Sequence, residues 1–131
     1  MINPQVPMSW GELLDRVSIL EIKCIRLRSP AARANVEHEL TALRPILAPI
    51  TSALDGLRRE MFAVNERLWL IEDGLRDHEA SGDFGAAFVA LARAVYRENA
   101  ARDRLKQAVN AQLQSGHGEE KQYGTADRDD A

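Results

Sequence analysis

The feature that most constrains the fold is an apolar repeat that advances in alternating steps of three and four residues. Near the start of the chain the repeat comprises Trp10, Leu13, Val17, Leu20, Cys24 and Leu27. This spacing places the side chains on one face of an α-helix that packs against near-antiparallel neighbours. No segment shows the two-residue alternation of a β-strand. The sequence therefore predicts an all-α fold.

A serine and a proline mark the two ends of the first helix. Ser9 precedes Glu12 by three residues, which is the pattern of a capping box, where two side chains satisfy free amides at a helix start. Pro30 disfavours helical backbone at the residue before it. We therefore expect the first helix over about residues 9–28.

Two prolines interrupt the second and longest segment. The apolar repeat predicts helix over about residues 31–80, and Pro45 and Pro49 remove two backbone donors near residues 45–49. The segment is either one long helix kinked at the prolines or two nearly collinear helices. A turn then precedes a third helix over about residues 84–114. The expected architecture is an antiparallel three-segment helical bundle with one long central helix.

Residues 115–131 differ in composition from the rest of the chain. They contain few apolar side chains, so burial cannot offset the entropy that ordering would cost. A chain of 131 residues suits one core. We expect residues 1–114 to form one helical domain and residues 115–131 to form a flexible, mostly disordered tail.

The charge and the cysteine content exclude several classes of function. The chain has 17 basic and 20 acidic residues and a net charge of -3, which gives no field that would select nucleic acid. The single cysteine, Cys24, cannot form an intrachain disulfide, which fits a reducing, cytoplasmic setting. The chain starts without a signal-peptide pattern, and no stretch approaches the roughly 20 apolar residues of a membrane span. We therefore expect a soluble cytoplasmic protein with no nucleic-acid partner and no membrane span.

Charged and amide side chains lie on or beside the apolar faces of all three segments. At about 100° per residue, the helical projection places these there: Glu21, Asn65, Glu72, Arg76, Glu98, Asn99, Arg102 and Lys106. A buried charge without a partner costs several kcal/mol, so groups of opposite sign are expected to meet one another or a ligand.

Two interpretations of these polar groups stay open. In the first, Glu21, Glu72, Arg102 and Lys106 neutralise one another in a closed network that fixes the order of the helices. In the second, the groups line a pocket between helices for a small anionic ligand, a carboxylate or phosphate compound. A mutase-like enzyme would use such a pocket, because positioning and electrostatics suffice for that chemistry. A water-accessible cavity bounded by Glu72, Arg102 and Lys106 would favour the second interpretation.

The sequence offers no motif for metal or cofactor chemistry. A di-metal helical bundle uses Glu-x-x-His, and no Glu or Asp precedes His38, His78 or His117 by three residues. Cys24 lies on the apolar repeat and is interpreted as a small core residue. The sequence therefore predicts no metal site and no cofactor.

Four short motifs resemble those of a family of short bacterial proteins of unknown function. They are Glu-Leu-x-Asp-Arg in the first helix, Asn-Glu-x-Leu-Trp-x-Ile-Glu-Asp in the second, Ala-Arg-x-Val-Tyr-x-x-Asn-x-x-Arg in the third and Glu-Glu-Lys-x-Tyr in the tail. The matching positions are Glu12, Asp15, Arg16, Glu21, Lys23, Asn65, Glu66, Trp69, Glu72, Asp73, Arg93, Tyr96, Asn99, Arg102, Lys106, Glu119, Glu120, Lys121 and Tyr123. The resemblance implies an association with bacterial surface-sugar and glycosyltransferase proteins, and it implies no activity, substrate or cofactor. Gly11, a poor helix former in a first turn, departs from the pattern.

The expected function is a non-enzymatic interaction or accessory module with a bacterial protein partner in envelope glycan synthesis; the alternative is the small-anion site or mutase-like enzyme. We also expect a homodimer. A continuous helix over residues 31–80 would be about 75 Å long at about 1.5 Å per residue, and Ile46, Leu47 and Ile50 have no obvious cover. Residues 43–57 would then lie at the interface, unless the prolines fold the segment back so that the chain covers itself.

Overall fold

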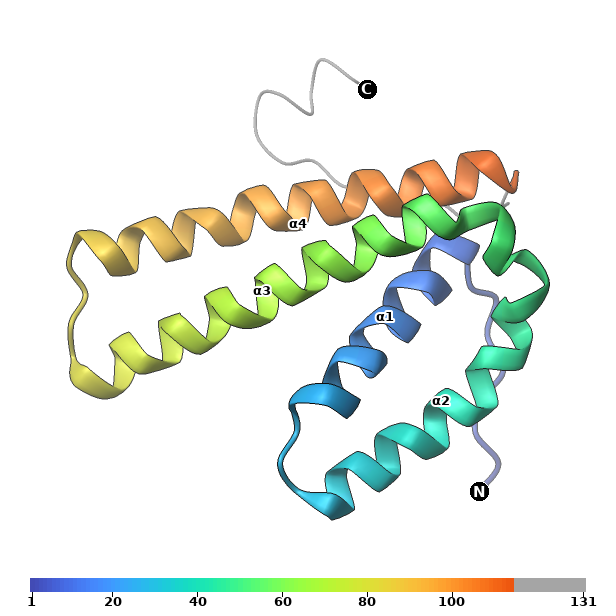
Figure 1. Cartoon of the computed structure of the whole chain (residues 1–131), viewed down its shortest axis with the longest axis horizontal. Coiled ribbons are helices and arrows are strands. Elements are labelled where there is room, and N and C mark those ends of the chain that lie inside the picture. Colours follow the sequence, from blue (N-terminus) through green and yellow to red (C-terminus); the bar gives the residue numbers. More distant parts are fainter. Residues whose placement is uncertain (115–131) are drawn as a thin grey trace.

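The structure, a computed structural model, describes residues 1–114. These residues form the helices α1 (Trp10–Arg26), α2 (Pro30–Thr51), α3 (Asp55–Ser81) and α4 (Ala86–Gln112), with the 3-10 helix η1 (Ser52–Leu54) between α2 and α3 (Figure 1). The described part of the chain contains no strand, which confirms the predicted all-α bundle. The predicted tail, residues 115–131 with the motif at 119–123, lies outside the described residues.

The helices form two antiparallel pairs joined at a bend. In Figure 1, α1 runs alongside α2, and α3 runs alongside α4 for most of their length. Helix α1 also packs against both α3 and α4, and it diverges from them toward its C-terminal end. Three helices therefore meet near the N-terminus of α1, whereas the far end of the α3–α4 pair consists of two helices alone.

The predicted cap starts α1. The hydroxyl of Ser9 accepts a hydrogen bond of 3.1 Å from the amide of Glu12, which satisfies one of the free donors of the first turn. Leu27 has extended backbone and ends the helix. Ser29 then caps α2, because its hydroxyl accepts from the amide of Ala32, and Pro30 occupies the first turn, where its missing donor costs nothing.

The long central segment is helical from the start of α2 to the end of α3, as predicted, and it changes direction at η1 (Figure 1). Pro45 and Pro49 lie inside α2 without ending it, so the change of geometry comes shortly after the predicted kink at residues 45–49. The side chain of Gln112, at the end of α4, donates a 2.9 Å hydrogen bond to the carbonyl of Ala53 in η1. This bond ties the bend to the last turn of the bundle.

The bend lets α2 and α3 pack on the same hydrophobic core. The buried cluster joins α1 to both arms of the bend and contains Leu13, Leu14, Val17, Leu20, Leu40, Leu47, Leu54, Met61 and Val109. The expectation that Leu47 lacks cover within the chain is therefore wrong, since its exposed fraction is 3%. Ile50 packs against the same cluster, and Ile46 stays 53% exposed. The chain therefore covers itself, as in the alternative expectation, but the bend lies at η1 and not at the prolines.

A glycine turn sets the two long helices side by side. Gly82 ends α3 with a φ of 69°, a left-handed conformation that favours glycine. The Asp83 carboxylate accepts a 3.1 Å hydrogen bond from the amide of Gly85, and α4 begins at the next residue. The third helix was predicted from about residue 84, and it begins at Ala86, so Phe84 precedes it and is 52% exposed.

Candidate functional site

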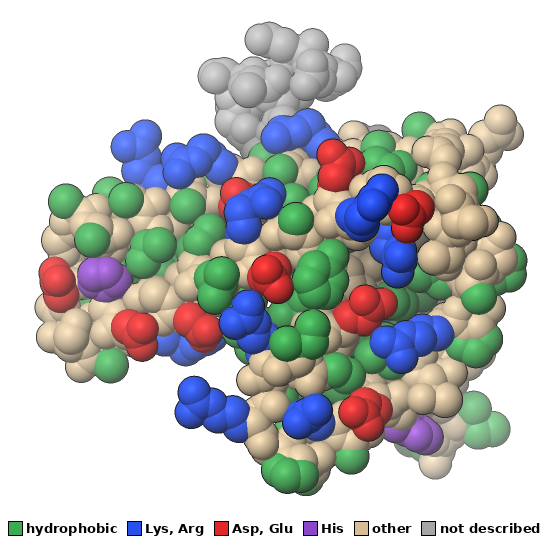
Figure 2. Space-filling view, in the orientation of Figure 1, with side chains coloured by type: hydrophobic (Ala, Val, Ile, Leu, Met, Phe, Trp, Pro, Cys, Tyr) green, Lys and Arg blue, Asp and Glu red, His purple; other side chains and the backbone are tan. Residues whose placement is uncertain are grey.

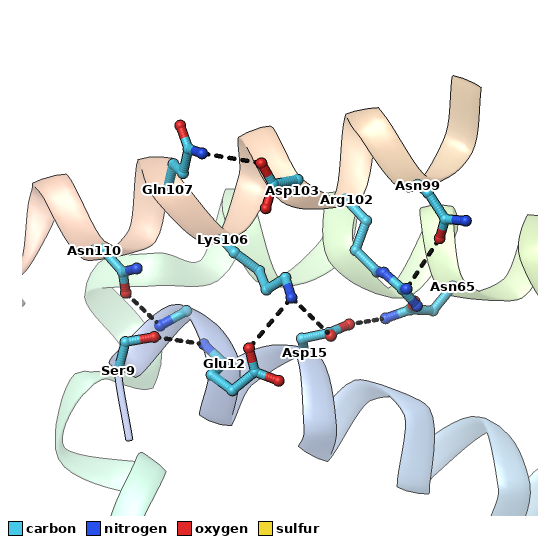
Figure 3. A network of polar contacts seen from close by, with 11 residues as sticks. Ser9, Glu12, Asp15, Asn65, Asn99, Arg102, Asp103, Lys106, Gln107 and Asn110 are labelled. Atoms are coloured by element: carbon cyan, nitrogen blue, oxygen red, sulfur yellow. Dashed lines mark hydrogen bonds and ion pairs between the residues drawn. The ribbon is translucent and has the colours of Figure 1, made fainter. Parts of the chain in front are cut away.

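Polar side chains gather where α1 crosses α3 and α4. We call this cluster the polar junction; its members are Glu12, Asp15, Ser18, Asn65, Asn99, Arg102, Lys106 and Asn110. Figure 3 shows the side chains of these residues other than Ser18 converging from the three helices. The junction has two parts with different chemistry, a closed ion-pair network around Lys106 and an open pocket beside Arg102.

Lys106 is neutralised inside the bundle. Its side chain is 8% exposed, and its ammonium lies 3.2 Å from the Glu12 carboxylate and 3.8 Å from that of Asp15, which is 7% exposed (Figure 3). A buried cation with two carboxylates beside it has the partners that burial requires. The inward orientation predicted for Lys106 is confirmed, but its carboxylates come from α1 at positions other than the predicted Glu21.

Asn65 links all three helices. Its amide nitrogen donates to Asp15 Oδ1 at 2.9 Å and to the Ser18 hydroxyl at 3.3 Å, and its amide oxygen accepts from Arg102 Nη1 at 3.3 Å. The residue is 4% exposed, as the helical projection predicts for an inward position. An amide suits this place because it can donate to α1 and accept from α4 at once.

The departure at Gly11 has a structural reason. Its backbone amide donates a 2.7 Å hydrogen bond to Asn110 Oδ1, and a Cβ atom added to Gly11 would lie 2.3 Å from the carbonyl oxygen of Lys106. Only a residue without a side chain lets α1 approach α4 so closely. Helix α1 thus accepts a poor helix former in its first turn because packing at the junction requires one.

Arg102 carries a charge that no carboxylate of the described residues neutralises. Its guanidinium donates to Asn99 Oδ1 at 2.9 Å and to Asn65 Oδ1 at 3.3 Å, and both acceptors are neutral amides. The side chain is partly buried, so it is held in place without being closed off from solvent. A guanidinium has five N–H donors, and two such bonds leave donors for another group.

A pocket of about 280 Å³ opens beside Arg102 between α1, α3 and α4. We call it the junction pocket. Its charged lining residues are Lys23, Glu72 and Arg102, and Asn65 and Asn99 add two amides. Lys106 does not line it. The second interpretation required a cavity bounded by Glu72, Arg102 and Lys106, and the pocket has Lys23 in place of Lys106. The first interpretation paired Lys106 and Arg102 with Glu21 and Glu72, whereas Lys106 pairs with Glu12 and Asp15, and Arg102 bonds to two amides.

The other predicted site residues lie apart. Glu72 is exposed, so the prediction that it faces inward is wrong, and Glu21 is partly buried with no hydrogen bond to a described residue. Glu98 forms an ion pair of 3.1 Å with Arg67 across the surfaces of α3 and α4. Arg76 is 64% exposed and pairs with Asp73 of its own helix at 2.6 Å.

The helical projection missed the polar residues that α1 contributes to the junction and to its pocket, together with Asn110 on α4. The missed residues on α1 are Glu12, Asp15, Ser18 and Lys23, of which Glu12, Asp15 and Lys23 appeared only as matches to the family motifs. The available signal was that α1 carries Ile19 and Ile22 outside its main apolar stripe. A helix that is apolar on more than one face is surrounded by neighbours, so its polar residues also meet partners.

A second region differs from the polar junction in the burial of its residues. We call residues 70–97, the far parts of α3 and α4 with their turn, the distal hairpin. None of these residues is buried. An apolar groove of about 380 Å³ is lined there by Leu75, Phe88, Ala92, Val95 and Tyr96, with Arg76 and Glu79 beside them. Apolar side chains also interrupt the charged ones along the hairpin end of the face seen in Figure 2.

Two kinds of site are absent from the described part of the chain. Residues 1–114 contain no group of three or more His, Cys, Asp and Glu side chains that could hold a metal ion. None of the helices among them has the length and apolar character to cross a membrane.

Comparison of the chain with protein-family models, with curated proteins and with solved structures finds no match. The resemblance to a bacterial family therefore stays a prediction from the motifs. Two regions of the structure bear on function, the junction pocket with its cations and the apolar groove of the distal hairpin.

Proposed function

We propose that the protein is a helical interaction module that pairs with a second copy of itself through the distal hairpin. One observation carries the proposal: across residues 70–97 two helices pack on each other and no residue is buried. Tyr96, which lines the groove, is 73% exposed. Two helices alone cannot enclose an apolar core, so this part of the molecule exposes the apolar surface that a helical bundle would bury.

A second copy is the occupant that fits this surface. Two hairpins packed face to face make a four-helix bundle, in which each groove is covered by the helices of the other. A two-fold interface brings the same patch together from both subunits, so the patch must be self-complementary. The groove meets this condition, because Arg76 and Glu79 stand beside one apolar stripe and a two-fold axis can set base against acid.

The resemblance of the four motifs supports a wider role as a proposal. In it, the module works in the bacterial cytoplasm as an accessory to a protein of envelope glycan synthesis. The homodimer would then present two identical polar junctions to that partner. This part of the proposal stands on the motifs alone, whereas the pairing stands on the hairpin.

The pairing is tested by light scattering on the full chain at micromolar concentration. We expect a mass of about twice the chain mass of 14.6 kDa. Tyr96→Glu should return the mass to that of one chain, because it places a charge in the groove on a side chain that is 73% exposed. Val89→Glu is the matched control, since Val89 is 49% exposed on the same helix and does not line the groove.

The two variants also give the outcomes that would contradict the proposal. A mass of one chain that stays constant on raising the concentration would exclude the dimer. A dimer that survives Tyr96→Glu and dissociates with Val89→Glu would place the interface on another face of α4. Both substitutions are at exposed positions, and circular dichroism checks that each variant keeps its helices.

A further inference from the structure

The junction pocket holds a cation whose charge the described chain leaves unneutralised. Arg102 is fixed by the amide oxygens of Asn65 and Asn99, at 3.3 and 2.9 Å, and by no carboxylate among residues 1–114. Lys106, four residues along the same helix, has carboxylates at 3.2 and 3.8 Å. The chain therefore places carboxylates beside the buried Lys106 ammonium of α4 and only neutral acceptors beside the partly buried Arg102 guanidinium.

A second cation stands across the same pocket. Lys23 of α1 is partly buried in the pocket lining, and no ion pair joins it to a described residue. Glu72 of α3 is exposed and contributes the only carboxylate of the lining. With Lys23 and Arg102 positive and Glu72 negative, the lining has a formal net charge of one positive, which a monoanion neutralises.

The rest of the lining is apolar and includes an indole. Ile19 and Ile22 come from α1, and Leu68 and Trp69 come from α3. The volume of about 280 Å³ is near the lower end of small-molecule sites, which start at roughly 300 Å³. A compact ligand with an apolar body and one anionic group would contact both the positively charged and the apolar parts of this lining.

We propose that the junction pocket binds a small organic monocarboxylate. The planar fork of the Arg102 guanidinium matches a carboxylate in two parallel hydrogen bonds, and Lys23 adds a second positive charge. The apolar body of the ligand packs against Trp69 and Leu68. This site goes beyond the pairing of hairpins, because its lining apart from Glu72 lies outside the distal hairpin and it needs no second copy.

Benzoate is the probe, and Trp69 supplies the signal. The chain has two tryptophans, Trp10 and Trp69. In a Trp10→Phe background, benzoate should change the fluorescence of Trp69 in a saturable manner below about 20 mM, a range of weak but specific affinity. Equilibrium dialysis of the unaltered chain gives the same dissociation constant without relying on either tryptophan.

Three charge variants assign the site. Lys23→Gln should weaken benzoate binding by about fivefold, and Glu72→Gln should tighten it by a factor of about two to three, because each changes one charge near the ligand in a partly solvated place. Arg59→Gln is the control, since Arg59 is 75% exposed near the start of α3, lines neither the junction pocket nor the groove and should leave the affinity unchanged. Lys23 and Glu72 form no ion pair with a described residue, so neither substitution breaks an ion pair among the described residues.

Two results would overturn the proposal. The first is the absence of saturable binding in both assays. The second is binding that responds to Arg59→Gln as much as to Lys23→Gln, which would mean nonspecific attraction to basic side chains. Inorganic phosphate is measured beside benzoate, and equal affinity for the two would overturn the assignment of a carboxylate with an apolar body. None of these results depends on the mass measured by light scattering, so the site and the dimer are judged separately.

Discussion

The polar junction and the distal hairpin are built from the same two helices and differ in almost every other respect. At the junction, α3 and α4 bury Asn65 and Lys106, and each has hydrogen-bonded or ionic partners. Along the hairpin no residue is buried, and Arg76 pairs with Asp73 of its own helix. The difference comes from α1, which packs on one region and not on the other.

The contrast shows what a third helix contributes. Helix α1 supplies the carboxylates of Glu12 and Asp15, without which the Lys106 cation could not remain buried. Where α1 diverges, charged residues stay in solvent and apolar residues stay half covered. A polar interior is therefore found where three helices meet, and a surface for a partner is found where only two do.

The sharpest way to test the contrast is to remove one cation from each region. Lys106→Met should lower the free energy of unfolding by about 3 kcal/mol, because it leaves the Asp15 carboxylate buried without its cation. Arg93→Met should lower it by less than about 0.5 kcal/mol, because Arg93 is exposed on the distal hairpin and lines neither the groove nor the junction pocket. Urea denaturation of the two variants measures both values.

A double variant shows whether the loss at Lys106 is a matter of charge. Adding Asp15→Asn to Lys106→Met should recover about 1 kcal/mol, since the new amide still accepts the hydrogen bond from Asn65. Strict additivity of the two single substitutions would show that the ion pair is not coupled. Equal losses for Lys106→Met and Arg93→Met would remove the distinction between the two regions.

A pair of glycines gives a second and smaller test. Gly11→Ala should cost about 2 kcal/mol, because the new methyl group would meet the backbone carbonyl of Lys106 at 2.3 Å and push α1 from α4. Gly74→Ala on the hairpin meets Leu91 Cδ1 at 2.9 Å, the end of a flexible side chain. The gain in helix propensity, about 1 kcal/mol, offsets that shift, so the net change should stay within about 0.5 kcal/mol.

Thermal unfolding of both alanine variants checks the difference. The expected order is a clear loss at Gly11 and almost none at Gly74. The reverse order would mean that the contact between α1 and α4 adapts more easily than the one between α3 and α4, and the junction would no longer count as the rigid part of the molecule.

The fold was predictable from periodicity and from a few special residues. The apolar repeat indicated the helices, and Ser9, Pro30, Pro45 and Pro49 indicated their start, their break and the region of the bend. The direction that the chain takes after the bend was not predictable. It depends on the burial of Leu47 and Leu54 against α1, which is a long-range contact that no local pattern contains.

The site was predictable in its residue types and not in its pairing. The projection placed Asn65, Arg102 and Lys106 inward, but it assigned Glu72 as a partner of the cations, and Glu72 lies exposed at the pocket. A projection treats each helix alone, so it gives the direction of a side chain and not the helix that it meets. The pairing of Lys106 with α1 depends on the close approach at Gly11, which appeared in the sequence only as a weakness.

The smallest expected effect concerns the stretch first assigned to the dimer interface, residues 43–57. Leu47 and Leu54 are 3% and 1% exposed there, so the chain itself covers them, and Ile46 is the large apolar residue left 53% exposed. Ile46→Asp should therefore change the free energy of unfolding by less than about 0.5 kcal/mol, as is usual for an exposed position. It should also leave the mass from light scattering unchanged, whereas Tyr96→Glu halves it. If Ile46→Asp instead gave the mass of one chain and Tyr96→Glu did not, the interface would lie at the bend, and the uncovered face of the distal hairpin would need another explanation.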